Sequence, residues 1–311
     1  MTAELQPATR TPGATGPRSG SLDATAVAVL TIGISCVSWA AVLIRLADAP
    51  PLAIAAWRLV LASVVVVPAA LLLARDELRA LAFPDVLRMA ASGGVLALHF
   101  ALWITSLEHT SVASSVVLVT TNPLWVALAA PVVLSEPVSR KMRLGVLLAF
   151  GGMVVVAGGD LAFARTALLG DMLALGGALA AAAYFLIGRE VRRRVSLLAY
   201  VAVAYGTAAA VLTLAALASG TQLTGFERDT WAIFALLAVG PQLLGHSSFN
   251  WALRRLSATF VAASVLGESA GSAALAWLVL GEAPTRSTVA GGALILAGLL
   301  VAARAEATDD P

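Results

Sequence analysis

The chain has 311 residues, of which 59% are hydrophobic and only 12% are charged, and its formal net charge is +2. Soluble domains carry about a quarter charged residues, so this composition and a mean hydropathy of +0.90 indicate a polytopic membrane protein. Alternation with a period of two residues is absent, which favours helical spans over the strands of an outer-membrane barrel. The arginines lie in short loops between apolar runs, so membrane topology accounts for the high pI without nucleic-acid binding.

Residues 1–25 contain no apolar core of the kind a secretory signal needs, and we expect a disordered cytoplasmic tail there. Ten apolar runs follow, each close to the length that crosses the hydrocarbon of a bilayer. The predicted spans are 26–45, 52–74, 86–106, 112–134, 143–159, 169–188, 197–218, 231–252, 259–280 and 287–303. We divide them into a first repeat, residues 26–159, and a second repeat, residues 169–303, before a cytoplasmic tail of residues 304–311.

The basic residues are distributed unevenly between the two sides of the predicted bundle. With the N-terminus in the cytoplasm, fifteen Lys and Arg residues lie inside and four outside, while Arg58 stands within a span. The positive-inside rule then predicts that both termini are cytoplasmic. Because the basic residues are almost all arginine, which is typical of a GC-rich bacterial genome, we expect a multi-pass protein of a bacterial inner membrane.

The second half of the chain repeats the pattern of the first. A shift of 146 positions aligns identical residues in the fourth and fifth spans of each half: Leu107 with Leu253, Ser111 with Ser257, Leu134 with Leu280, Glu136 with Glu282, Gly145 with Gly291 and Gly152 with Gly298. The shift passes five spans, an odd number, so the two copies point in opposite directions across the bilayer. Inverted repeats predict a binding site near the midplane and transport by alternating access.

Residues 110–159 and 257–302 each resemble one copy of the EamA domain of the drug/metabolite transporter superfamily. Several residues match the family pattern. Glu136 and Glu282 match the glutamate that closes the fourth helix of each copy, and Arg58 resembles an arginine of the second helix. The glycines of the fifth helix are matched by Gly145, Gly152, Gly291 and Gly298. The second copy departs from the pattern at Ser269, where the first has Pro123. The resemblance implies ten helices in two inverted five-helix repeats, a central cavity, peripheral fifth and tenth spans, and export of amino acids or related metabolites. Some members of the family import other solutes.

Charged and titratable residues within spans are the candidates for chemistry, because a charge at the bilayer centre costs about 2.5 to 3.5 kcal/mol. Glu268 lies in the middle of the ninth span and aligns with Asn122 of the first repeat. We interpret it as a cavity residue that binds a proton or a cationic group of the solute; a structural contact with a polar neighbour or with Arg58 is the alternative. Arg58 is either a ligand for a carboxylate or a structural ion-pair partner or interface anchor.

His99 and His246 fall one residue apart after the repeat shift, and an imidazole can change its charge near neutral pH. They therefore suit a cavity lining, although a lone histidine in a helix is more often a hydrogen-bonded structural group. Polar and aromatic side chains at similar depth complete the predicted substrate or proton site: Asn122, Asn250, Trp39, Trp103 and Trp125.

Glu136 and Glu282 follow directly after a span, and we expect each to cap the N-terminus of the next helix. Gly267, Ser269 and Gly271 fit the nucleophile-elbow pattern, but they lie inside an apolar run and not in a strand–turn–helix, so an intramembrane protease using Ser269 and His246 is only a remote alternative. No metal or cofactor motif is present, and the lone Cys36 offers no disulfide. The sequence therefore predicts a transporter, not an enzyme, with a small-molecule substrate and the lipid bilayer as its surroundings, and it leaves the oligomeric state open, a monomer included.

Overall fold

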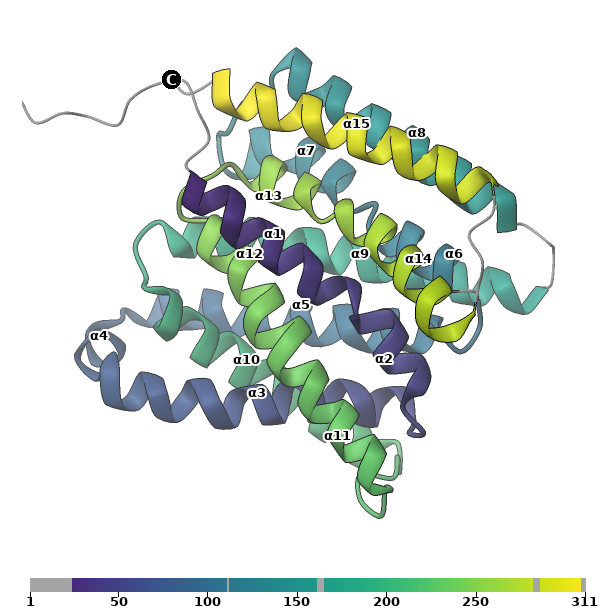
Figure 1. The fold of residues 1–311 in the computed structure, drawn as a ribbon. Coiled ribbons are helices and arrows are strands. Elements are labelled where there is room, and N and C mark those ends of the chain that lie inside the picture. The colour runs from purple at the N-terminus through teal and green to yellow at the C-terminus, as the bar shows by residue number, and fades with distance from the viewer. Residues whose placement is uncertain (1–23, 111, 161–164, 282–285, 309–311) are drawn as a thin grey trace, which may run out of the picture.

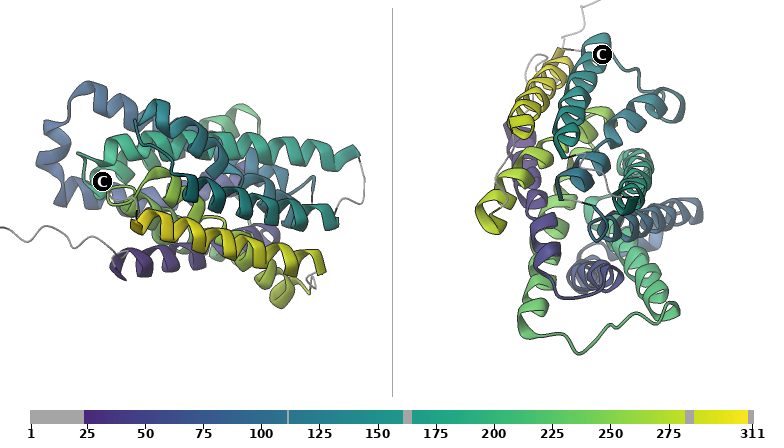
Figure 2. Two further views of the ribbon diagram at one scale, coloured as in Figure 1. Left: turned by 90° about the horizontal axis from the view of Figure 1, so that it is seen from above. Right: turned by 90° about the vertical axis from the view of Figure 1, so that its right-hand side faces the viewer.

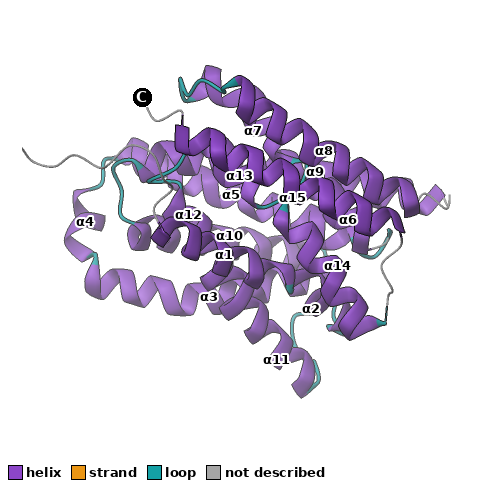
Figure 3. Ribbon diagram, turned by 45° about the horizontal axis from the view of Figure 1, so that its top comes forward, coloured by secondary structure: helices purple, strands orange, loops and turns teal. Residues whose placement is uncertain are grey.

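The computed structural model describes residues 24–308, except for 111, 161–164 and 282–285 (Figure 1). Within these residues all regular elements are helices and none is a strand (Figure 3). The helices are α1 (Ala24–Ser38), α2 (Ala40–Leu46), α3 (Pro51–Leu73), α4 (Arg75–Ala80), α5 (Phe83–Ser106), α6 (Val112–Val119), α7 (Asn122–Val133), α8 (Arg140–Asp160), α9 (Arg165–Arg192), α10 (Leu197–Ala218), α11 (Arg228–Leu237), the π-helix η1 (Ala238–His246), α12 (Ser247–Ala252), α13 (Ala258–Ser264), α14 (Gly267–Leu280) and α15 (Arg286–Thr308).

Each predicted span coincides with one helix or with a stack of consecutive helices. In the described part of the chain, nine stretches are long and apolar enough to cross a membrane, so a multi-pass helical protein is confirmed. Helix α8 is not among these nine, and the number of ten membrane helices stays a prediction. Helices α9 and α15 continue past the apolar runs into segments that contain charged residues. Residues 304–308 are therefore helical, where a tail was expected. The predicted N-terminal tail lies outside the described residues, apart from its last two positions.

Four spans are interrupted where the chain passes through the interior of the bundle. The first divides between α1 and α2, the fourth between α6 and α7, and the ninth between α13 and α14, while η1 replaces two turns of the eighth. The breaks in the fourth and ninth spans occupy matching places in the two repeats. Threonine and serine hydroxyls next to them bond to carbonyls of the preceding turn, at 2.7 Å from Thr120 to Val116 and 2.6 Å from Ser264 to Val261. Such bonds compete with the helical ladder and favour a bend.

The start of α1 and the end of α15 lie at the same end of the bundle (Figures 1 and 2). That end also holds the connection between α9 and α10 and the connection between α12 and α13. It is the end to which the charge distribution assigns the cytoplasm. Because the two described ends of the chain lie on the same side, they agree with an even number of membrane crossings.

Helices α8 and α15, the last of each repeat, run side by side along one edge of the molecule (Figures 1 and 2). Glycines allow their backbones to touch: a Cβ placed on Gly298 would lie 2.5 Å from the carbonyl oxygen of Gly145, and one on Gly152 would lie 2.5 Å from that of Gly291. Small residues serve this purpose in lipid, where close packing between helices replaces the hydrophobic effect. We call this contact the glycine seam; it joins the two repeats.

We predict that Gly298→Ala destabilises the protein by about 1–3 kcal/mol, because a methyl group in the seam must push two backbones apart. Gly292 lies on the same helix, and a Cβ placed there would meet no other atom within 4 Å, so Gly292→Ala is the matched control and should be neutral or slightly stabilising. Melting temperatures of the two variants in detergent test the seam. Equal melting temperatures would contradict it.

Candidate functional site

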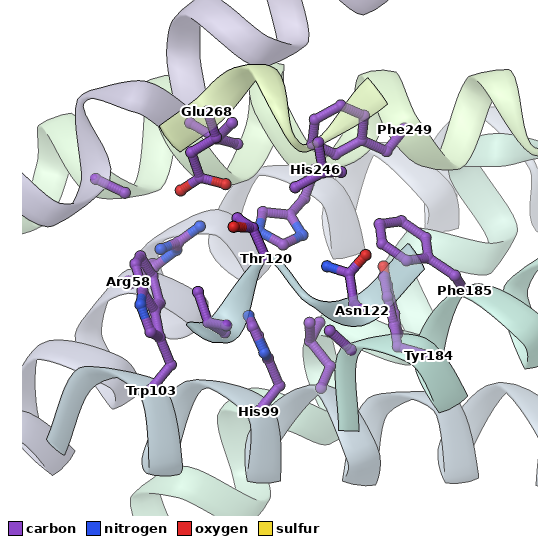
Figure 4. A pocket seen from close by; sticks show the side chains of 16 residues that line it. Arg58, His99, Trp103, Thr120, Asn122, Tyr184, Phe185, His246, Phe249 and Glu268 are labelled. Atoms are coloured by element: carbon purple, nitrogen blue, oxygen red, sulfur yellow. The ribbon is translucent and has the colours of Figure 1, made fainter. Parts of the chain in front are cut away.

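A cavity lies in the centre of the bundle, between the two repeats (Figure 4). Its volume of about 30 Å³ has room for only one or two water molecules. Its walls come from the interrupted spans together with α3, α5 and α9. The lining residues are Val37, Ala40, Arg58, Leu96, His99, Trp103, Val119, Thr120, Asn122, Ala181, Tyr184, Phe185, His246, Phe249, Val265 and Glu268.

Arg58 lies on α3, seven residues after that helix begins, and its side chain is completely buried. Its Nε donates a hydrogen bond of 2.9 Å to Oε1 of Gln242, and its guanidinium carbon stands 4.1 Å from the ring centre of Phe100. Neither Nη1 nor Nη2 has a hydrogen-bond partner among the described residues. Burying a guanidinium with two unpartnered nitrogens is unfavourable, and an anionic or polar acceptor that bonds to these nitrogens would offset the cost.

Glu268 lies in the first turn of α14, directly after the break in the ninth span, and only 7% of its surface is exposed. Its carboxylate points toward the guanidinium of Arg58 across the cavity (Figure 4). Among the described residues, no salt bridge of 4.0 Å or less joins Glu268 to Arg58. The cavity therefore presents a cation and a carboxylate that face each other without closing an ion pair.

His99 and His246 meet in the same cavity, with ring centres 6.3 Å apart. His99 shares a hydrogen bond of 2.9 Å between its Nδ1 and the carbonyl oxygen of Gly177, and it stacks on Trp103. In the part of the chain that the structure describes, five of the eight buried polar side-chain atoms without a partner belong to residues of the cavity lining: Nη1 and Nη2 of Arg58, Nε1 of Trp103, Oδ1 of Asn122 and Nδ1 of His246. Because buried polar groups are nearly always hydrogen-bonded, this concentration indicates a place built for a polar ligand.

The structure brings together six of the nine predicted substrate or proton residues: Arg58, His99, Trp103, Asn122, His246 and Glu268. It does not bring in Trp39 and Trp125, which are 42% and 37% exposed on the outside of the bundle. Asn250 is fully buried, but it lies beside the cavity, where its amide donates to the hydroxyl of Tyr184 at 2.6 Å. The sequence does not indicate whether an aromatic side chain within a span faces the cavity or the outside of the bundle.

Sequence reasoning missed Gln242 and a cluster of three tyrosines, which are all the tyrosines in the chain. Tyr184, Tyr200 and Tyr205 are buried next to the cavity on the side of the α9–α10 connection. Tyr200 shares a hydrogen bond of 2.6 Å with Ser92, and Asn250 donates to Tyr205 at 3.2 Å. These hydroxyls and amides form a buried polar cluster that meets the cavity at Tyr184, one of its lining residues. The clustering of all three tyrosines in the sixth and seventh spans was the available signal.

Ser269 does not contact His246. Its hydroxyl shares a hydrogen bond of 2.9 Å with Thr120, the residue at the break in the fourth span. This bond links the two helix breaks across the repeat interface. Among the described residues, no three His, Cys, Asp or Glu side chains gather closely enough to hold a metal ion.

Glu136 links the repeats at the end of the bundle where α9 ends. It accepts hydrogen bonds from Arg189 at 2.5 Å and Arg193 at 2.8 Å, and from the backbone N–H of Ala258 at 3.2 Å. The expectation that it caps the next helix is wrong: it caps α13, a helix of the other repeat. Partial burial opposes ionisation, but the hydrogen bond and charge of Arg189, together with the bonds from Ala258 and Arg193, outweigh it and hold the pKa of Glu136 below its ordinary value. The matching Glu282 lies outside the described residues.

Comparisons with known proteins agree with this geometry. Residues 25–158 and 168–304 each match the family described as the EamA-like transporter family. A solved structure described as "Crystal structure of protein" aligns with a TM-score of 0.74 and 19% sequence identity, over 89% of this chain and 97% of that one. At this identity, the likeness shows the fold. A comparison with curated proteins finds no match.

We predict that Glu136→Gln lowers the melting temperature at neutral pH by about 2–4 °C. The pKa of Glu136 is depressed in the folded protein, so its contribution is complete above the unfolded value of about 4.3 and disappears as the pH falls through the lower folded value. The melting temperatures of wild type and variant should therefore converge in acid. Glu190→Gln, at a 40% exposed ion pair, is the control and should change little. A difference that stays constant down to about pH 3 would contradict the assignment.

Proposed function

Because the chain belongs to the EamA-like transporter family, a group of membrane transporters of the drug/metabolite type, we propose that it is a secondary transporter that exports small metabolites such as amino acids by alternating access. The observation that carries this proposal is the central cavity, where Arg58 and Glu268 face each other and five polar atoms lack partners among the described residues. The charge distribution supports both termini in the cytoplasm, and the near-exclusive use of arginine as the basic residue supports a bacterial inner membrane.

The charges of the cavity favour a solute that carries both a carboxylate and an amine. The unpartnered nitrogens of Arg58 match a carboxylate, and the carboxylate of Glu268 matches an ammonium group. Trp103, Phe185 and Phe249 supply apolar walls for the rest of the solute. An amino-acid zwitterion combines these features, and its two charges would satisfy the two facing groups of the protein at once.

The geometry also supports alternating access. A cavity of about 30 Å³ is far too small for an amino acid, so the solute enters only after the helices around the cavity rearrange. The breaks between α6 and α7 and between α13 and α14 lie at matching places in two inverted repeats, next to Asn122 and Glu268. Discontinuous helices of this kind are where inverted-repeat transporters bind and move their substrates.

Glu268 is the proposed proton carrier of the cycle. An intramembrane carboxylate facing a polar cavity is a functional residue by default, and the inward proton gradient contributes about 2.3 kcal/mol per 100 mV of membrane potential. The same cavity and cycle serve uptake of a small organic solute when the gradients are reversed. Export is the direction that the family resemblance favours.

Flux in proteoliposomes tests the proposed function directly. The purified protein is supplied with a mixed pool of amino acids and other metabolites, with and without an imposed pH gradient. We expect amino acids to move, and to move faster with the gradient. Movement that ignores the gradient would remove the proton coupling, and no movement of any solute would contradict transport of this class.

We predict that Glu268→Gln folds and inserts normally but loses the dependence of flux on the pH gradient, because an amide cannot exchange a proton. The neighbouring Ser269→Ala is the matched control: it removes the hydroxyl bonded to Thr120 and should keep the gradient dependence. The measurement is initial flux at several gradients for each variant. An unchanged pH dependence in Glu268→Gln would reduce that carboxylate to a packing role.

A further inference from the structure

We infer that Gln242 is a positioning residue that makes Arg58 a selective receptor for a carboxylate. The inference rests on the proposed function, since it concerns how the same cavity recognises its solute. Gln242 is not part of the cavity lining and its side chain is fully buried, so it acts on the solute only through Arg58.

The contacts of Arg58 fix which of its nitrogens face the solute. Gln242 accepts from Nε, and the ring of Phe100 covers one face of the guanidinium. Nη1 and Nη2 remain without partners among the described residues. A guanidinium is planar and donates in a rigid fork, so fixing one edge and one face fixes the direction of the remaining donors. The remaining nitrogens then stand ready for the two oxygens of one carboxylate.

The neutrality of Gln242 matters as much as its position. An amide oxygen orients the guanidinium without cancelling its charge. A carboxylate in the same place would form a closed ion pair and leave Arg58 with little attraction for a second anion. Within the described part of the chain the amide nitrogen of Gln242 has no hydrogen-bond partner within 3.5 Å and only approaches Tyr205, so the one close bond of this buried side chain is the bond to Arg58. That is an unfavourable arrangement for packing alone.

The π-helix explains how Gln242 reaches Arg58. Gln242 follows Pro241 in η1, and its carbonyl accepts from the N–H of Ser247, five residues later. Proline lacks the N–H of a regular helix, and π-helical turns are frequent at functional sites. The position that matches Gln242 in the first repeat is Leu96, on the uninterrupted helix α5. The receptor combines Arg58 of the first repeat with Gln242 of the second, and the exchanged repeats offer no second copy of it, which gives the solute a fixed orientation.

Two substitutions separate positioning from packing. Gln242→Met keeps the length of the side chain but removes the acceptor, and Gln242→Glu keeps an acceptor but adds a charge. Leu244→Met, on the same π-helix and 49% exposed, is the matched control for changes in η1 itself. The Gln242→Glu variant retains the bond to Arg58, so it carries the test if Gln242→Met does not fold.

The full-length protein in detergent is titrated calorimetrically with acetate and acetamide, and with the standard amino acids and their amides. We expect wild type and Leu244→Met to prefer each acid over its amide. In both Gln242 variants, the ratio of acid to amide affinity should fall by about tenfold to a hundredfold, because the fork is misdirected or neutralised. A purely structural role would weaken acid and amide together and leave this ratio unchanged.

An unchanged ratio in the Gln242 variants would overturn the inference. Wild-type protein that binds no carboxylate in the panel would also overturn it, because Arg58 would then not be a carboxylate receptor. Neither result decides the proposed function, which the flux of solutes in proteoliposomes decides separately. A transporter that moves other solutes and ignores carboxylates would keep the transport proposal and lose only this inference.

Discussion

Hydrocarbon offers no hydrogen bonds, and this constraint determines where the chain can depart from a regular helix. The breaks of the first, fourth and ninth spans lie in the interior, where protein groups receive the released backbone atoms. The carbonyl of Ser38, at the break between α1 and α2, accepts from Ser272 of the other repeat at 3.0 Å. The hydroxyls of Thr120 and Ser264, which lipid cannot satisfy, bond back to their own helices. Irregular backbone and polar side chains therefore gather in one place, and that place is the cavity.

A buried cation is the least favourable feature of this arrangement. Arg58 offsets part of its desolvation through one hydrogen bond and the ring of Phe100, and it faces Glu268 without contacting it. A closed ion pair would be more stable and would also leave nothing for a ligand to contribute. A polar solute that forms hydrogen bonds with the unpartnered atoms around the cavity therefore offsets their cost of burial, and this gain contributes to its binding free energy.

The sequence predicted well what depends on hydropathy and on isolated charges. Spans stand out because apolar runs are long, and Arg58 and Glu268 stand out because charged residues are rare inside them. Prediction failed where the answer depends on direction or on distant partners. Trp39 and Trp125 resemble Trp103 in sequence but face outward. Glu136 caps a helix that begins 122 residues later in the chain. Gln242 changes the hydropathy of its span little, and its contact with Arg58 joins residues 184 positions apart, so no local pattern predicts it.

The glycine seam between α8 and α15 has a consequence for movement. These helices belong to different repeats, yet their backbones touch at several points and leave no room for side chains to slide past one another. The two helices therefore behave as a single rigid body that both repeats share. In the proposed alternating-access cycle, the other spans of each repeat turn about this common support. The support stands at the edge of the molecule, with Leu147 and Leu300 exposed, so the element about which the proposed movement turns is one that the surrounding lipid contacts directly.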